Sequence, residues 1–201
     1  MVALERLSVS LAMLVWAQLR GIVHEHLPRL PAESYRGFAF VHWIMTVEQR
    51  HTGWLDDRVY LRLREVLLHT TTKYHLLCPV YCVMPDHLHM LWLGISDGSD
   101  QRLAAQFFRK WTNPLLGLRA WQKQAYDHVL REDERKEKAF ESICDYILLN
   151  PVRAKLVEHK SQYAFSGAMI PGYPGLDPNA PEYWEKFWKI YYRFTGRADL
   201  K

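Results

Sequence analysis

The sequence has few cysteines and lacks a hydrophobic run long enough to span a bilayer. Its three cysteines, Cys78, Cys82 and Cys144, form neither a CxxC pair nor an even disulfide framework. This pattern argues for a reducing compartment and against a disulfide-stapled scaffold. The apolar stretch 7–19 is too short for a membrane helix, and its flank is not clearly basic. We interpret it as an amphipathic N-terminal helix or extension rather than a signal peptide, and expect the protein to be cytoplasmic.

Internal repeats and low-complexity segments are also absent from the sequence. With 201 residues, of which 49% are hydrophobic and 13% aromatic, the chain is long enough to bury one sizeable core. This composition excludes a disordered, collagen-like or coiled-coil protein. Proline and glycine breaks suggest an N-terminal extension at 1–30, a catalytic domain at 31–160, and a Pro/Gly loop with an aromatic extension at 161–201.

The basic residues are not in large excess, but their excess is localised. The formal net charge is +4. This positive charge comes from residues 101–160, because the net charges of the parts before and after this block cancel each other. A localised basic segment is suited to contact a phosphate backbone, so this part of the chain is where we expect a nucleic acid to bind.

Hydrophobic periodicity and turn residues predict an alternation of strands and helices. The order is strand, helix, two strands, helix, strand and then further helices. This order predicts an α+β fold: a ferredoxin-like (RRM-like) βαββαβ antiparallel sheet with helices on one face, plus a C-terminal catalytic helix and an aromatic tail. The expected strands are 37–47, 74–84, 87–95 and 125–130; the expected helices are 56–70, 101–111, 139–149 and a terminal one at 183–192.

Two histidines stand two residues apart in one predicted strand, within Met84-Pro-Asp-His-Leu-His-Met-Leu-Trp-Leu93. Because side chains alternate along a strand, His87 and His89 share one face and Leu88 faces the core. Two neutral imidazoles on a rigid strand hold a divalent metal if a third ligand comes from elsewhere. The alternative is a pair of ordinary hydrogen-bonded histidines.

A tyrosine and an asparagine stand four residues apart late in the predicted helix 139–149, which Pro151 is expected to stop. The spacing places Tyr146 and Asn150 on one helical face, one turn apart. A phenol is a competent covalent nucleophile, and an amide oxygen is a competent metal ligand. The alternative is a half-buried tyrosine followed by an asparagine that caps the helix.

Taken together, the two motifs resemble those of a known enzyme family. The strand ending Tyr81-Cys-Val-Met-Pro-Asp-His-Leu-His-Met-Leu91, followed by Asp145-Tyr-Ile-Leu-Leu-Asn-Pro-Val-Arg-Ala-Lys-Leu-Val157, is similar to the REP-associated tyrosine transposases of the single-tyrosine HUH transposase superfamily. The resemblance runs from about Phe38 to Val157, more than half of the chain. Asp86 and Lys155 depart from it, and we expect neither to touch the chemistry.

The resemblance implies a DNA endonuclease and strand transferase. His87 and His89 match the family's metal-binding histidines, and Asn150 matches the polar residue that completes a Mg²⁺ or Mn²⁺ site. Tyr146 matches the nucleophile that forms a 5′-phosphotyrosine. The implied partner is single-stranded or hairpin DNA with palindromic repeats, and the family includes both homodimers that share active sites and monomers.

Several basic and aromatic residues are candidates for DNA contacts outside the two motifs. We name Arg109, Lys110 and Arg153 for the phosphates, and Trp111 or Trp121 for stacking on an unpaired base. Two further histidines, His42 and His128, have no spacing that places them at the site, and we assign them a structural or DNA-backbone role.

Three other functions are open at this point. The same fold with lost catalysis gives a DNA-binding module. A metal-dependent phosphodiesterase uses activated water and leaves no phosphotyrosine. A small RNA-binding ferredoxin-like domain carries exposed aromatic residues on its central strands, whereas the motif strand here carries two histidines.

Overall fold

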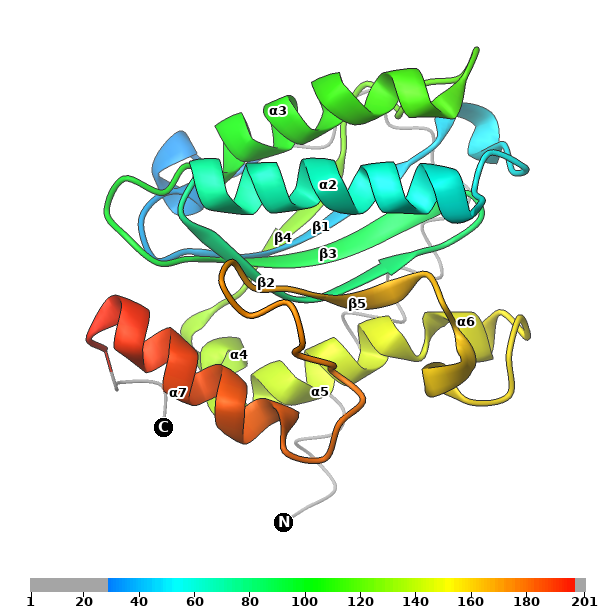
Figure 1. Cartoon of the computed structure of the whole chain (residues 1–201). Helices are drawn as coiled ribbons and strands as arrows, with labels where there is room; N and C mark the ends of the chain where they lie inside the picture. The colour runs from blue at the N-terminus through cyan, green and yellow to red at the C-terminus, as the bar shows by residue number, and fades with distance from the viewer. Residues whose placement is uncertain (1–28, 198–201) are drawn as a thin grey trace.

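The computed structural model describes residues 29–197 of the chain. Its centre is a five-stranded antiparallel sheet with helices on both faces (Figure 1). The predicted N-terminal helix lies outside the described residues. Within the described part, no helix is long and apolar enough to cross a membrane.

The strands and helices follow the predicted order. The strands are β1 (Phe40–Thr46), β2 (Leu76–Val83), β3 (His87–Gly94), β4 (Tyr126–Val129) and β5 (Ser166–Met169); the helices are α2 (Asp57–Lys73), α3 (Gln101–Thr112), α4 (Glu132–Arg135), α5 (Glu137–Leu148), α6 (Asn150–Arg153) and α7 (Tyr183–Thr195). The sheet order is β4-β1-β3-β2-β5. The predicted α+β class with an antiparallel sheet is therefore confirmed. The prediction that the helices lie on one face holds only for α2 and α3, because α5 and α7 pack on the opposite face.

Aspartates begin the two helices that cover one face of the sheet. The Asp56 carboxylate accepts a hydrogen bond from the amide of Val59, and Asp100 accepts from the amides of Arg102 and Leu103. Both arrangements satisfy amides that the first helical turn leaves without an internal partner. These caps fix where α2 and α3 start relative to the strands that precede them.

Alternate residues of each central strand enter two different cores. On the α2–α3 face, the side chains of Trp43, Leu88 and Trp92 are almost wholly buried. The opposite face is covered by α5 and α7 (Figure 1). Leu91 and Leu93 belong to the buried cluster that contains residues of these two helices. The prediction that Leu88 faces the core is confirmed.

The C-terminal segment adds a strand where the sequence predicts a loop. Strand β5 pairs with β2 through Met169↔Cys78, Gly167↔Tyr81 and Ser166↔Cys82. Its sequence, Ser-Gly-Ala-Met, lacks the β-branched and aromatic residues that predict strands. The strand forms because the open edge of the buried β2 offers unpaired backbone groups.

The aromatic tail forms the predicted terminal helix and closes the second core. The rings of Tyr183, Phe187 and Tyr191 are buried, and Phe187 stacks on Phe140 of α5 with ring centroids 6.3 Å apart. The residues expected as a C-terminal extension thus contribute a strand and a covering helix to the same structure.

Candidate functional site

Strand β3 presents the two predicted histidines to the sheet face that α5 covers. His87 and His89 alternate with Leu88 and share their face with Leu91. Their Nε2 atoms lie 3.0 Å apart. His89 is only 2% exposed, so the pair sits at the inner wall of the site rather than on open surface. The same-face prediction for the two histidines is confirmed.

Asp86 orients the first histidine. The Asp86 carboxylate accepts a hydrogen bond from Nδ1 of His87 at 2.5 Å, and its other oxygen lies 2.7 Å from the Arg50 guanidinium. The hydrogen bond from His87 and the charge of Arg50 lower the pKa of Asp86 to about 2. The expectation that Asp86 stands away from the histidine chemistry was wrong, because this tight turn folds the aspartate back onto the neighbouring ring.

His42 orients the second histidine from strand β1. Its Nε2 lies 3.0 Å from Nδ1 of His89, and the two rings are stacked. Burial lowers the pKa of His42 to about 3 and moves the pKa of His89 well below its usual value. Both rings are therefore neutral at pH 7. Sequence reasoning missed His42 because the contact depends on the β1–β3 register, which pairs Ile44 with His89.

A fourth histidine continues this row onto β4. His128 is the direct register partner of His42, so both side chains point to the same face. Its Nε2 lies 3.0 Å from the Glu134 carboxylate. The charge of His128 also contributes to the low pKa of His42, after burial.

Tyr146 and Asn150 meet at the end of α5, together with Arg153. The Arg153 guanidinium stacks on the Tyr146 ring, with its Cζ atom 3.7 Å from the ring centroid. It also donates to the Tyr146 carbonyl and to Oδ1 of Asn150, each at 2.9 Å. The Asn150 amide donates to the Ile147 carbonyl at 3.0 Å, which is the helix-capping arrangement considered above.

Pro151 begins a helix here instead of only ending one. Helix α5 ends at Leu148, and the short α6 starts at Asn150 with Pro151 near its N-terminus. The missing proline N–H costs nothing there because the first-turn amides have no helical partner. The sequence predicted only the end of a helix at Pro151, because proline is better known for breaking helices than for starting them.

Arg153 connects the tyrosine end of the site with the histidines electrostatically. Its charge contributes to the low pKa of His89, after burial and the neighbouring imidazoles. In turn, burial lowers the pKa of Arg153, and Tyr146 opposes that shift. The guanidinium is therefore within electrostatic reach of both groups. Among the described residues, no hydrogen bond joins Tyr146 or Asn150 to the histidine pair.

The histidine pair suits a divalent cation in spacing and in donor chemistry. Two nitrogens held at right angles about 2.1 Å from one cation lie about 3.0 Å apart. Asp86 keeps the proton of His87 on Nδ1, and His42 accepts a hydrogen bond from the Nδ1–H of His89 in the tautomer that frees Nε2 of His89. Such partners on the far ring nitrogen are typical of metal-binding histidines. Within the described residues, no group of three or more His, Cys, Asp or Glu side chains is arranged so that it could hold a metal ion together, so the two histidines need further ligands of another kind, such as an amide, a water or the substrate.

The other predicted DNA contacts lie on α3, on the opposite face of the sheet. The Arg109 guanidinium donates to the backbone carbonyl groups of Gln122 and Lys123. Lys110 is exposed beside Trp111, whose side chain is 54% exposed. Trp121 is buried, and its indole donates to Thr112. Arg153 is the member of the predicted set that the fold brings to Tyr146.

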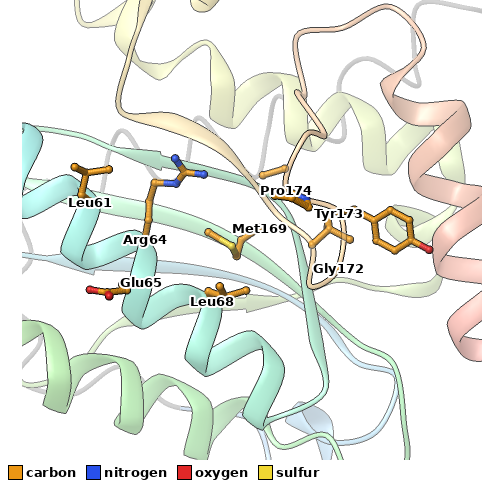
Figure 2. A pocket seen from close by; sticks show the side chains of 10 residues that line it. Leu61, Arg64, Glu65, Leu68, Met169, Gly172, Tyr173 and Pro174 are labelled. Atoms are coloured by element: carbon orange, nitrogen blue, oxygen red, sulfur yellow. The ribbon is translucent and has the colours of Figure 1, made fainter.

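A separate groove lies between α2 and the segment that follows β5 (Figure 2). It has a volume of about 360 Å³ and carries none of the predicted site residues. Leu61 and Leu68 of α2 face Met169 and Pro174 across it, with Arg64 beside them. The groove is mostly apolar and lacks the acid–base and metal-binding groups of the histidine face.

Comparisons with known proteins agree with the motif resemblance. No protein-family model matches the chain. The REP-associated tyrosine transposase of Escherichia coli strain K12 is 25% identical over 126 residues, which are 62% of this chain and 74% of that protein. A solved structure of a REP-associated tyrosine transposase bound to a REP hairpin has a TM-score of 0.59 at 22% identity, covering 70% of this chain and 81% of that one.

The fold, with its central antiparallel sheet, is similar to that of the solved REP-associated tyrosine transposase. In sequence, the chain is similar to the REP-associated tyrosine transposases. The resemblance indicated by the two sequence motifs is thereby confirmed.

Proposed function

We propose that this protein is a transposase-type DNA endonuclease and strand transferase that cleaves single-stranded hairpin DNA through a 5′-phosphotyrosine at Tyr146. One observation carries the proposal. The Nε2 atoms of His87 and His89 converge at 3.0 Å on the sheet face that α5 covers, and α5 carries Tyr146 stacked against Arg153.

His87 and His89 would hold a Mg²⁺ or Mn²⁺ ion, with the Asn150 amide as the expected further ligand. When bound, the metal supplies positive charge that neutralises and orients the scissile phosphate. Asp86 and His42 keep the two imidazoles in the tautomers that present Nε2. Asn150 is bound to Arg153 in this structure, so its use as a ligand requires that contact to exchange.

Tyr146 would attack the phosphorus in line with the leaving oxygen. The bond from its phenolic oxygen to phosphorus forms as the bond to the 3′ oxygen breaks. The phenol loses its proton, and the leaving oxygen gains one to become a free 3′-OH. The phosphotyrosine linkage conserves the phosphodiester, so a 3′-OH from another strand can reverse the step and join there.

Arg153 is suited to assist this step directly. Its guanidinium is held over the phenol ring and anchored to the Tyr146 carbonyl. A guanidinium matches phosphate oxygens in a bidentate way. We therefore assign Arg153 to the scissile phosphate, and leave Arg109 and Lys110 as proposed contacts on the opposite face.

Hairpin DNA is the proposed substrate because the solved relative is described as bound to a REP hairpin. The buried His42 and His89 rings have lowered pKa values and contribute no positive charge at pH 7. The positive charge that meets DNA phosphates therefore comes from arginines and from the metal.

The deciding experiment is a cleavage assay on end-labelled single-stranded hairpins from the flanks of the gene, with Mg²⁺ or Mn²⁺. Wild type is compared with Tyr146→Phe and with Tyr173→Phe, a matched control on the far groove. We expect a slow-migrating covalent band that needs metal, survives in the control and is absent from Tyr146→Phe. Cleavage that persists in Tyr146→Phe would establish water-based hydrolysis, and binding without cleavage by wild type would establish an inactive DNA-binding module.

A further inference from the structure

A recess at the far end of the histidine face combines aromatic and cationic side chains. Its volume is about 270 Å³. The rings of Phe40 and Tyr191 form a buried floor, and Phe38 is partly exposed at the side. The charged members of the lining are Arg135, Lys136, Arg197 and Glu132, so cations outnumber anions.

Two of the cations lie close to the floor of the recess and to the start of α5. Arg135 is held by a hydrogen bond from its Nε to the Leu130 carbonyl and lies 5.7 Å from the Phe40 ring centroid. Burial lowers the pKa of Arg135 and so does the charge of Arg197, whereas Tyr191, Glu132 and Glu134 raise it. Lys136 is the N-cap residue of α5. A phosphate bound beside these side chains would face the positive end of the helix dipole.

The recess also offers a stacking surface. The Arg197 guanidinium lies over the Phe38 ring, with its Cζ atom 4.8 Å from the ring centroid, so the two form a cation–π pair. Unpaired bases stack on aromatic rings and on guanidinium planes, and they do so with little dependence on sequence. The volume of the recess is close to the lower end of the range for ligand pockets, which is about 300 Å³. This size suits one nucleotide and excludes a duplex.

Both β1 and α5 run from the recess toward the proposed catalytic groups. Phe40 stands two residues before His42 on the same face of β1, and four before Ile44, which pairs with His89. Four strand residues span about 13 Å. Lys136 precedes α5, and Tyr146 follows ten residues later, about 15 Å along the helix. Stacked nucleotides rise about 3.4 Å each, so about four of them cover this distance.

We propose that this recess binds one nucleotide of the single-stranded DNA that flanks the cleaved phosphate. Its phosphate lies against Arg135, Lys136 and Arg197, and its base stacks on Phe38. The inference rests on the proposed function for the identity of the strand, and it adds a binding subsite that selects unpaired DNA beside the hairpin.

The test measures binding without cleavage. In the Tyr146→Phe background, fluorescence anisotropy follows a labelled hairpin with a single-stranded extension across a salt series. The double variant Lys136→Gln/Arg197→Gln is compared with Arg58→Gln/Arg119→Gln, which removes the same charge from exposed positions at α2 and the loop after α3. A charge-preserving double variant, Lys136→Arg/Arg197→Lys, separates charge from folding defects.

We expect the first double variant to bind on the order of tenfold more weakly and to lose about 1.4 from its salt slope, since each single-strand phosphate contact contributes about 0.7. The other two double variants should retain the wild-type slope. In a second arm, 5-iododeoxyuridine at successive positions should cross-link to the Phe38 peptide only within about four nucleotides of the cleaved phosphate.

Several outcomes would overturn the subsite. They are equal binding by the neutralised variant and its matched control, cross-links confined to the hairpin stem, or binding of dAMP or inorganic phosphate in the recess that leaves DNA affinity unchanged. The last result would assign the recess to a free nucleotide or phosphate. All binding is measured in the Tyr146→Phe background, so it does not depend on cleavage. If the binding tests support the subsite but wild type forms no covalent band, only the proposed function is refuted.

Discussion

Strand β3 separates a packing face from a chemical face within eight residues. Leu88, Met90 and Trp92 point toward α2 and α3 into an apolar core, whereas His87 and His89 point toward the α5 side. Both sets are largely buried, but only the second set exchanges hydrogen bonds through its side chains.

The difference shows how the fold supports reactive groups. An apolar face stabilises the sheet by removing carbon surface from water. A buried imidazole gains little from burial and depends on partners for both ring nitrogens. The Nδ1 atoms of His87 and His89 have such partners in Asp86 and His42, and Nε2 of His128 has one in Glu134. Substitutions on the two faces should therefore separate activity from stability.

The largest expected effect on activity, after loss of the nucleophile, comes from His87→Gln. This change removes one of the two converging nitrogens, and a metal at a scissile phosphate is worth several kcal/mol. We expect covalent adduct formation to fall by about 10³-fold, equivalent to about 4 kcal/mol. The thermal midpoint should no longer rise when Mn²⁺ is added, unlike that of wild type. A variant that still shows the Mn²⁺ shift would place the metal elsewhere.

The neighbouring Leu88→Ala should have the opposite signature. Leu88 is fully buried against the α2–α3 core, so the truncation leaves a cavity and should lower the free energy of unfolding by about 2–5 kcal/mol. Urea denaturation followed by circular dichroism measures the change. At a low temperature at which the variant is still folded, the folded protein should form the covalent adduct at close to the wild-type rate. A large loss of specific activity without destabilisation would contradict the separation of the faces.

Much of the candidate site could be predicted from the sequence, because it depends on the spacing of residues within one strand or one helix. The two-residue spacing of His87 and His89 puts them on one face in any strand. The four-residue spacing of Tyr146 and Asn150 puts them together at a helix end. The capping contacts of Asn150 were also among the interpretations that the sequence left open.

What the sequence did not predict depends on contacts between distant segments. His42 reaches His89 only because of the strand register, across 47 positions. Strand β5 has a sequence with low strand propensity and is specified by the edge that it joins. Asp86 was expected not to touch the chemistry, and its contact with His87 depends on the side-chain geometry of the turn between β2 and β3.

Arg153→Lys tests whether the cation beside the nucleophile acts through geometry or through charge alone. Lysine retains the charge but loses the planar stack on Tyr146 and the forked contacts to Asn150. We expect adduct formation to fall about tenfold, about 1.4 kcal/mol in the barrier, with DNA affinity nearly unchanged. Single-turnover kinetics at saturating DNA isolate this step. A wild-type rate in the lysine variant would show that Arg153 acts through its charge alone and not through its stacking geometry.

The smallest effect should come from Asp86→Asn, which keeps an acceptor for Nδ1 of His87 and removes its charge. Loss of a metal ligand's hydrogen-bonding partner typically costs 10–100-fold in affinity or activity, and a retained acceptor should reduce this to about threefold. Mn²⁺ titration followed by the thermal midpoint measures the affinity, and saturating Mn²⁺ should restore the adduct rate. Arg50→Gln is the matched control, because it removes the ion pair to Asp86 and leaves the carboxylate in place. If Asp86→Asn is as defective as His87→Gln at saturating Mn²⁺, the aspartate takes part in the chemistry itself rather than orienting the imidazole.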